Sequence, residues 1–199
     1  MPFEIQFSKD LTLDIRQCPH LLIIGKGDKE SNFANAIQEQ CCPLDSSGCE
    51  PGYYVDHDWW YDTDRENAWF MEMLEERYFL LNATNLANIE QYNQKFKLED
   101  WFYRILLASP SILKHDASRQ VLMKGRAVGM YVIMFADSVA EFGDNTDLLD
   151  MFPVKLVYKV NNADESLLVT GYVGAEKLKD NKFMLCELGK QPLFYEMGV

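Results

Sequence analysis

The sequence lacks a long apolar run and a basic leader, and these two absences limit where the protein can reside. No stretch approaches the roughly 18 consecutive apolar residues that a transmembrane helix requires. The first residues, Met1-Pro2-Phe3-Glu4, have neither the positive charge nor the apolar segment of a secretory signal. We therefore expect a cytoplasmic protein with no membrane contact.

The chain also lacks a surplus of positive charge. Its 199 residues include 19 Lys+Arg against 31 Asp+Glu, which gives a formal net charge of −12. The basic residues form only small groups with acids beside them. One such group is Lys177, Lys179 and Lys182, which has Glu176 and Asp180 as neighbours. Because proteins that grip nucleic acid do so by neutralising phosphates with lysine and arginine, this balance disfavours a nucleic-acid partner.

The chain lacks the features of a disulfide framework. The five cysteines are an odd number, and without a secretory signal free thiols are expected. Cys41, Cys42 and Cys49, together with His57, could in principle hold zinc, but adjacent cysteines rarely ligate one tetrahedral ion well. We therefore expect no metal site, and an unrelated α/β protein with a zinc-held loop remains the weaker alternative.

Apolar runs alternate with helical patterns along most of the chain, which predicts an α/β fold with a mostly parallel sheet flanked by helices. The expected strands cover residues 21–24, 104–108, 131–136 and 154–160, the last of them nearer a sheet edge because its polar and apolar residues alternate. The expected helices cover residues 31–40, 64–82, 88–96 and 118–128. Residues 183–188 and 193–197 predict a closing C-terminal β-hairpin.

The length suits one domain, so we treat residues 1–199 as a single domain. Residues 41–62 interrupt the pattern with turn-forming prolines, glycines and serines and then a cluster of aromatic and acidic residues. This segment is interpreted as an irregular excursion with a few extended residues.

The loop after the first buried strand stands where a phosphate-binding loop would stand, but its residues do not fit one. Such a loop needs G-x-x-x-x-G-K-[ST] between a strand and a helix. The residues present are Gly25, Lys26, Gly27, Asp28, Lys29, Glu30 and Ser31, so Glu30 takes the lysine position if Ser31 keeps the serine position. A carboxylate about 4 Å from a phosphate charge costs roughly 4 kcal/mol at an effective dielectric constant of 20.

Several segments, in order and with matching spacing, resemble the motor domain of the FtsK/SpoIIIE DNA translocases. PHLLIIG at 19–25 is similar to the family's entry into its phosphate loop, and LEERY at 74–78 is similar to its M-E-R-R-Y helix. KGRAVG at 124–129 resembles K-A-R-A-A-G. Further matches lie at Asn88, Tyr92 and Asn93, and from Pro153 through GAEKL at 174–178 to Met184-Leu185. The resemblance implies a RecA-like P-loop NTPase fold and a structural role for His20 with its hydrogen bonds satisfied.

The residues that carry catalysis in this family are replaced. The family's Walker B strand ends in Asp-Glu, whereas the corresponding strand here runs into Ala108 and Ser109. A Gln-Arg pair of the family is replaced by Ala136-Asp137, and Leu167 stands in place of an arginine close to the nucleotide. We therefore identify no catalytic residue, and we interpret Gly25–Ser31 as a degenerate phosphate loop and Ala108 and Ser109 as a degenerate Walker B end.

Two functions follow from the resemblance. The first is a non-catalytic relative, a pseudo-ATPase without a cofactor, that acts as a protein-binding or assembly subunit; its partner would be an active FtsK-like ATPase or a second copy of itself. The alternative is an ATP-dependent DNA translocase that binds ATP and magnesium through an atypical loop, with Lys26 or Lys29 in place of the missing lysine.

Overall fold

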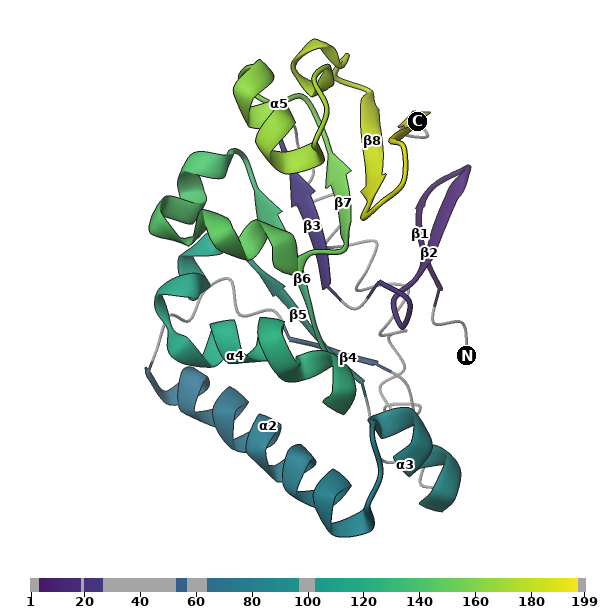
Figure 1. Ribbon diagram of the computed structural model, residues 1–199, viewed down its shortest axis with the longest axis vertical. Helices are drawn as coiled ribbons and strands as arrows, with labels where there is room; N and C mark the ends of the chain where they lie inside the picture. The colour runs from purple at the N-terminus through teal and green to yellow at the C-terminus, as the bar shows by residue number, and fades with distance from the viewer. Residues whose placement is uncertain (1–3, 19, 27–52, 57–63, 97–102, 197–199) are drawn as a thin grey trace, which may run out of the picture.

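The computed structural model describes residues 4–18, 20–26, 53–56, 64–96 and 103–196. Its central feature is a seven-stranded sheet in the order β4-β5-β6-β3-β7-β8-β9 (Figure 1). The first five strands in this order are parallel, and β8 and β9 add to β7 in antiparallel fashion. The mostly parallel α/β fold expected from the sequence is confirmed.

Where the structure describes the predicted elements, their bounds follow the prediction closely, whereas the expected helix at 31–40 lies outside the described residues. The strands of the large sheet are β3 (His20–Ile24), β4 (Tyr53–Asp56), β5 (Tyr103–Ala108), β6 (Met130–Ala136), β7 (Val154–Val157), β8 (Lys182–Glu187) and β9 (Leu193–Glu196). The α-helices are α2 (Asp64–Thr84), α3 (Ile89–Phe96), α4 (Asp116–Lys124) and α5 (Ala163–Thr170). Short 3-10 helices are η1 (Pro110–Lys114), η2 (Gly125–Val128), η3 (Val139–Met151) and η4 (Ala175–Lys177).

The sheet separates two apolar layers because successive side chains of a strand point to opposite faces. Leu22 and Ile24 of β3 pack in a cluster that includes residues of α2 and α4. Leu21 and Ile23 pack on the other face, where a small hairpin of β1 (Glu4–Ser8) and β2 (Leu11–Asp14) covers the sheet. All of β3 and β6 is buried, as expected of central parallel strands.

Helix α2 confirms the predicted apolar stripe. Phe70, Leu74 and Leu81 are buried, whereas Met73 and Tyr78 are partly buried against the same cluster. Within the described ranges, no helix is both long enough and apolar enough to cross a membrane. The closing hairpin is confirmed as β8 paired with β9, whereas the sequence did not predict the β1–β2 hairpin.

The expectation for residues 154–160 was wrong in two respects. The strand ends at Val157, and it lies inside the sheet between β3 and β8 rather than near an edge. The alternation that suggested an edge arises because Lys155 is only half-buried, with its charged end attached to a long apolar stem. The neighbouring Leu156 and Val157 are fully buried.

Candidate functional site

The carboxyl ends of the parallel strands form the edge of the sheet where ligands bind in open α/β folds. The two predicted site segments follow β3 and β5, and these strands are not neighbours because β6 lies between them. Ile24, the last residue of β3, is level with Ala136, the last residue of β6. Ala108, the last residue of β5, is level with Met134 and ends two residues earlier. The structure thus brings Gly25 and Ala108 to one edge of the sheet.

The chain leaves β3 through a tight turn at Gly25. This residue has a φ of 117°, a conformation that favours glycine, and a Cβ added here would lie 2.8 Å from the main-chain carbon of Tyr158. Its amide donates to the Ala136 carbonyl at 3.0 Å, and the Lys26 amide donates to the Lys159 carbonyl at 2.8 Å. The first two amides of the loop are therefore bonded to the protein's own main chain.

The end of β5 presents a hydroxyl group and no acid. Ala108 is buried, and Ser109 follows in extended conformation before Pro110 begins η1. The Ser109 hydroxyl lies 2.6 Å from that of Ser111, so the two share a hydrogen bond. Neither side chain can supply the carboxylates that a Walker B strand provides.

Two glutamates at the same edge bind main-chain amides. The Glu165 carboxylate accepts from the amide of Val139 at 2.6 Å and from that of Asn161 at 2.8 Å, and it thereby joins the segments that follow β6 and β7. The Glu141 carboxylate accepts from the amides of Asp137 and Ser138 at 2.6 Å and 3.1 Å.

Sequence reasoning missed both glutamates as parts of this edge. The available signal was the spacing S-x-x-E at 138–141 and N-x-x-E at 162–165, which is typical of a capping box. Ser138 and Glu141 do form a complete capping box. The Asn162 side chain accepts from the Glu165 amide, which leaves the Glu165 carboxylate to reach beyond its own helix.

Leu167, which stands in place of the family's arginine, projects from α5 with 52% of its surface exposed. Leu168, the next residue, and Val173, after the helix, are also exposed. Leu167, Leu168 and Val173 therefore present exposed apolar surface in the segment after β7.

Other predicted residues fall outside this edge. Gly27, Asp28, Lys29, Glu30 and Ser31, and likewise Cys41, Cys42, Cys49 and His57, lie outside the described residues. So does most of the 41–62 excursion, of which residues 53–56 form β4. Within the part of the chain that the structure describes, no three histidine, cysteine or acidic side chains gather to hold a metal.

His20 is buried as the resemblance implies, but its hydrogen bonds are only partly satisfied. Its Nδ1 accepts from the Val132 amide at 3.2 Å, whereas its buried Nε2 has no partner among the described residues. Burial, and after it the positive charge of Arg126, lower the pKa of His20 to about 4. The imidazole is therefore neutral at neutral pH.

The two cysteines in the described ranges are free and buried. Burial raises the pKa of Cys18 to about 12 and that of Cys186 to about 11. Both thiols are therefore protonated at neutral pH, and neither has the character of a nucleophile.

Comparisons with known proteins agree with this architecture. No family model matches the chain. The chain is 27% identical over 131 residues to the DNA translocase FtsK of Borreliella burgdorferi and 28% identical over 130 residues to that of Chlorobaculum tepidum. Each match covers 59% of this chain, and the chain spans only 16% of the length of these relatives.

Two solved structures share the fold over nearly the whole chain. The cytoplasmic domain of the Type VII secretion ATPase EccC of Thermomonospora curvata has a TM-score of 0.69 at 15% identity, covering 98% of this chain and 28% of that one. The pCW3 conjugation coupling protein TcpA, solved with ATPγS, also has a TM-score of 0.69 at 17% identity, covering 94% and 62%. The fold is thus that of a RecA-like P-loop ATPase domain.

Within this class, the sequence matches favour one branch. The sequence motifs suggested a resemblance to the FtsK/SpoIIIE motor domain, and the matches to two FtsK translocases support it. The chain is thus similar to FtsK translocases over 59% of its length, which supports an FtsK/SpoIIIE-like domain.

Proposed function

We propose that this domain is a non-catalytic member of its class, a pseudo-ATPase that serves as a protein-binding or assembly subunit. The observation that carries the proposal is the end of β5, where Ala108 and Ser109 offer no carboxylate. P-loop ATPases hold magnesium through a loop serine or threonine and a Walker B aspartate, and catalysis rests on positioning and charge stabilisation. Without the acids, the metal that neutralises the transferred phosphate loses its anchor.

The phosphate side of the site supports the same proposal. A phosphate loop binds its ligand with free main-chain amides. The amides of Gly25 and Lys26 are bonded to Ala136 and Lys159, and Glu30 brings a negative charge to the position of the lysine. The loop is therefore poorly suited to a triphosphate.

The protein's own carboxylates also occupy the amides around this edge. The N–H groups of Asp137, Ser138, Val139 and Asn161 all donate to Glu141 or Glu165. These donors would otherwise favour an anion. Because the carboxylates of Glu141 and Glu165 occupy these donors, they stabilise this edge of the sheet and repel a phosphate.

A direct test is calorimetric titration with Mg-ATP together with a phosphate-release assay. We expect no saturable binding below about 1 mM, which corresponds to a binding free energy weaker than about −4 kcal/mol, and no phosphate release above the buffer background. An active FtsK motor domain measured in parallel is the positive control. Micromolar binding or steady turnover would refute the pseudo-ATPase assignment.

The alternative, an ATP-dependent translocase with an atypical loop, is favoured by one observation. Lys26 and Lys159 are opposite each other in an antiparallel bridge, and both are exposed. Two neighbouring ammonium groups could attract a phosphate. If so, Lys26→Ala or Lys29→Ala removes ATP binding while Lys190→Ala, an exposed lysine on the β8–β9 turn at the opposite edge of the sheet, does not. Equal nucleotide affinity in all three variants would dismiss this alternative.

The assembly role is proposed for the apolar surface formed by Leu167, Leu168 and Val173. We expect light scattering to detect a complex with an active FtsK-like motor domain, or a self-associated form, that Leu167→Glu weakens. Leu188→Glu is the matched control because Leu188 is 86% exposed on the turn between β8 and β9. A complex that neither substitution affects would place the contact elsewhere.

The cytoplasmic location expected from the sequence stays a prediction.

A further inference from the structure

A cavity of about 810 Å³ opens at the amino end of β6, at the opposite edge of the sheet from the candidate nucleotide site. The seven residues of β6 separate the two edges by roughly 20 Å. Residues from the β2 end, α2, α3, the α4–η2 turn and β6 line the cavity, so segments far apart in the sequence form it. Its size is that of a ligand pocket.

The resemblance motifs LEERY and KGRAVG meet beside this cavity. The Arg77 guanidinium donates to the Val128 carbonyl at 2.6 Å, and the Tyr78 hydroxyl donates to the Lys124 carbonyl at 2.8 Å. A Cβ at Gly125 would collide with the Met130 carbonyl oxygen, so the turn packs tightly against β6. These contacts hold the main chain of the turn and leave the Lys124 and Arg126 side chains exposed.

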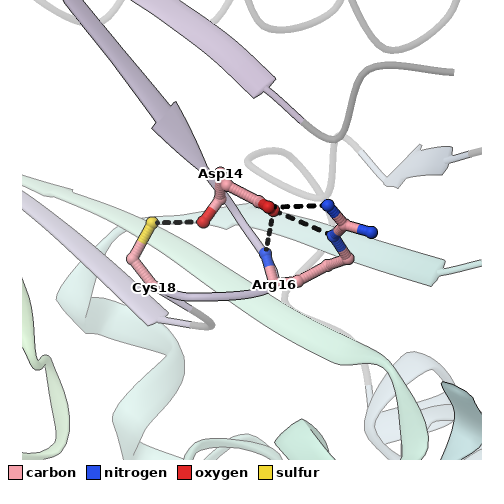
Figure 2. A network of polar contacts seen from close by, with 3 residues as sticks. All are labelled: Asp14, Arg16 and Cys18. Atoms are coloured by element: carbon pink, nitrogen blue, oxygen red, sulfur yellow. Dashed lines mark hydrogen bonds and ion pairs between the residues drawn. The ribbon is translucent and has the colours of Figure 1, made fainter.

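Lys124 and Arg126 are the cations of this cavity that no acid in the described part of the chain neutralises. The remaining cation, Arg16, is paired with Asp14. As Figure 2 shows, Nε and Nη2 of Arg16 bond the two carboxylate oxygens of Asp14 at 3.0 Å and 2.7 Å, while the Cys18 thiol donates to the Asp14 carbonyl. This pairing holds the pKa of Asp14 below its usual value.

The rest of the lining decides what kind of anion fits. Met123 is an exposed apolar side chain next to Lys124, and Glu90 adds an acid at the start of α3. A nucleic-acid strand would place phosphates near Glu90, which repels them. Of the two aromatic residues in the described lining, Tyr131 is only 3% exposed and offers a base little surface for stacking. A peptide can pair its carboxylates with Lys124 and Arg126 and pack an apolar side chain against Met123. Its main-chain N–H groups can donate to Glu90.

We propose that this cavity binds an acidic peptide segment of a partner protein, with Lys124 and Arg126 holding its carboxylates. The proposal does not depend on whether the opposite edge binds or hydrolyses ATP. Main-chain packing of the KGRAVG segment does not require the exposed charges of Lys124 and Arg126, and the proposal assigns them a binding role.

Fluorescence anisotropy with a labelled hexapeptide of sequence Glu-Glu-Leu-Glu-Leu-Glu tests the site on the full chain. We expect saturable binding that weakens as salt rises. The double variant Lys124→Glu/Arg126→Glu should lose at least about tenfold in affinity. The control is Lys179→Glu/Lys190→Glu, which changes the net charge equally at exposed lysines away from the cavity and should stay within about twofold. Glu90→Gln should raise the affinity.

Circular dichroism establishes that each variant is folded. Equal losses in the two double variants would show a general charge effect and overturn the proposal. The proposal would also fail if the peptide does not bind, or if a labelled oligothymidylate binds in its place and loses affinity with Lys124→Glu/Arg126→Glu.

Discussion

At the scale of single residues, Glu165 shows how one side chain can connect two strands. Its carboxylate is almost fully buried and accepts from the amides of Val139 and Asn161, which follow β6 and β7. A buried carboxylate is expensive unless it is hydrogen-bonded, and both of its oxygens are. The residue therefore stabilises the edge that a nucleotide would otherwise approach.

Replacing Glu165 should cost stability without any ligand present. Glu165→Ala leaves two amides without an acceptor, and we expect a loss of about 3 kcal/mol in the free energy of unfolding. The neighbouring Asp164→Ala removes an exposed acid from the first turn of α5 and should cost less than about 1 kcal/mol. Urea denaturation measures both values, and equal losses would contradict the role assigned to Glu165.

The buried His20 predicts a pH dependence of stability. Its pKa is lowered to about 4 in the folded protein, against roughly 6.5 in the unfolded chain. Because the unfolded chain takes up the proton first, this contribution is complete above about pH 6.5 and is lost as the pH falls toward 4. The loss is on the order of 3 kcal/mol.

His20→Asn should flatten this part of the curve while it keeps an acceptor for the Val132 amide. The measurement is urea denaturation of both proteins between pH 4 and 7, and the difference between the curves isolates His20 from other titrating groups. Parallel curves would show that the imidazole does not contribute.

At the scale of elements, the exit of the chain from β3 is fixed by close approach to the end of β7. Ile24 accepts from the Tyr158 amide at 2.7 Å, and the next two amides return bonds to Ala136 and Lys159. Gly25 fits this turn because its φ is positive and because Tyr158 leaves no room for a Cβ.

Substitution at two glycines separates backbone strain from collision. Gly25→Ala combines a positive φ with a clash against main chain, whereas Gly171→Ala has a φ of 75° and open space around it. We expect about 1 kcal/mol for Gly171→Ala and at least about 2 kcal/mol more for Gly25→Ala. Comparable unfolding free energies for the two variants would show that the turn relaxes easily.

At the scale of the whole molecule, the net charge of −12 opposes binding to DNA. We expect a dissociation constant weaker than about 0.1 mM for a 20-base-pair duplex at 0.15 M salt. An FtsK motor domain measured on the same duplex is the control. Micromolar binding whose affinity falls steeply with salt would contradict this expectation and favour the translocase alternative.

The sequence by itself determined the types of β3, β5, β6, α2, α3 and α4, although not the β1–β2 hairpin or α5, and it showed that the chain contains no G-x-x-x-x-G-K-[ST] pattern. Runs such as Leu21–Ile24 and the 3/4 spacing of Phe70, Leu74 and Leu81 are local signals, so they could be read without the fold. Local patterns carry no information on strand order or on contacts between distant segments. The tertiary structure therefore decided the interior place of β7, the amides bound by Glu165, and the cavity beside Lys124 and Arg126.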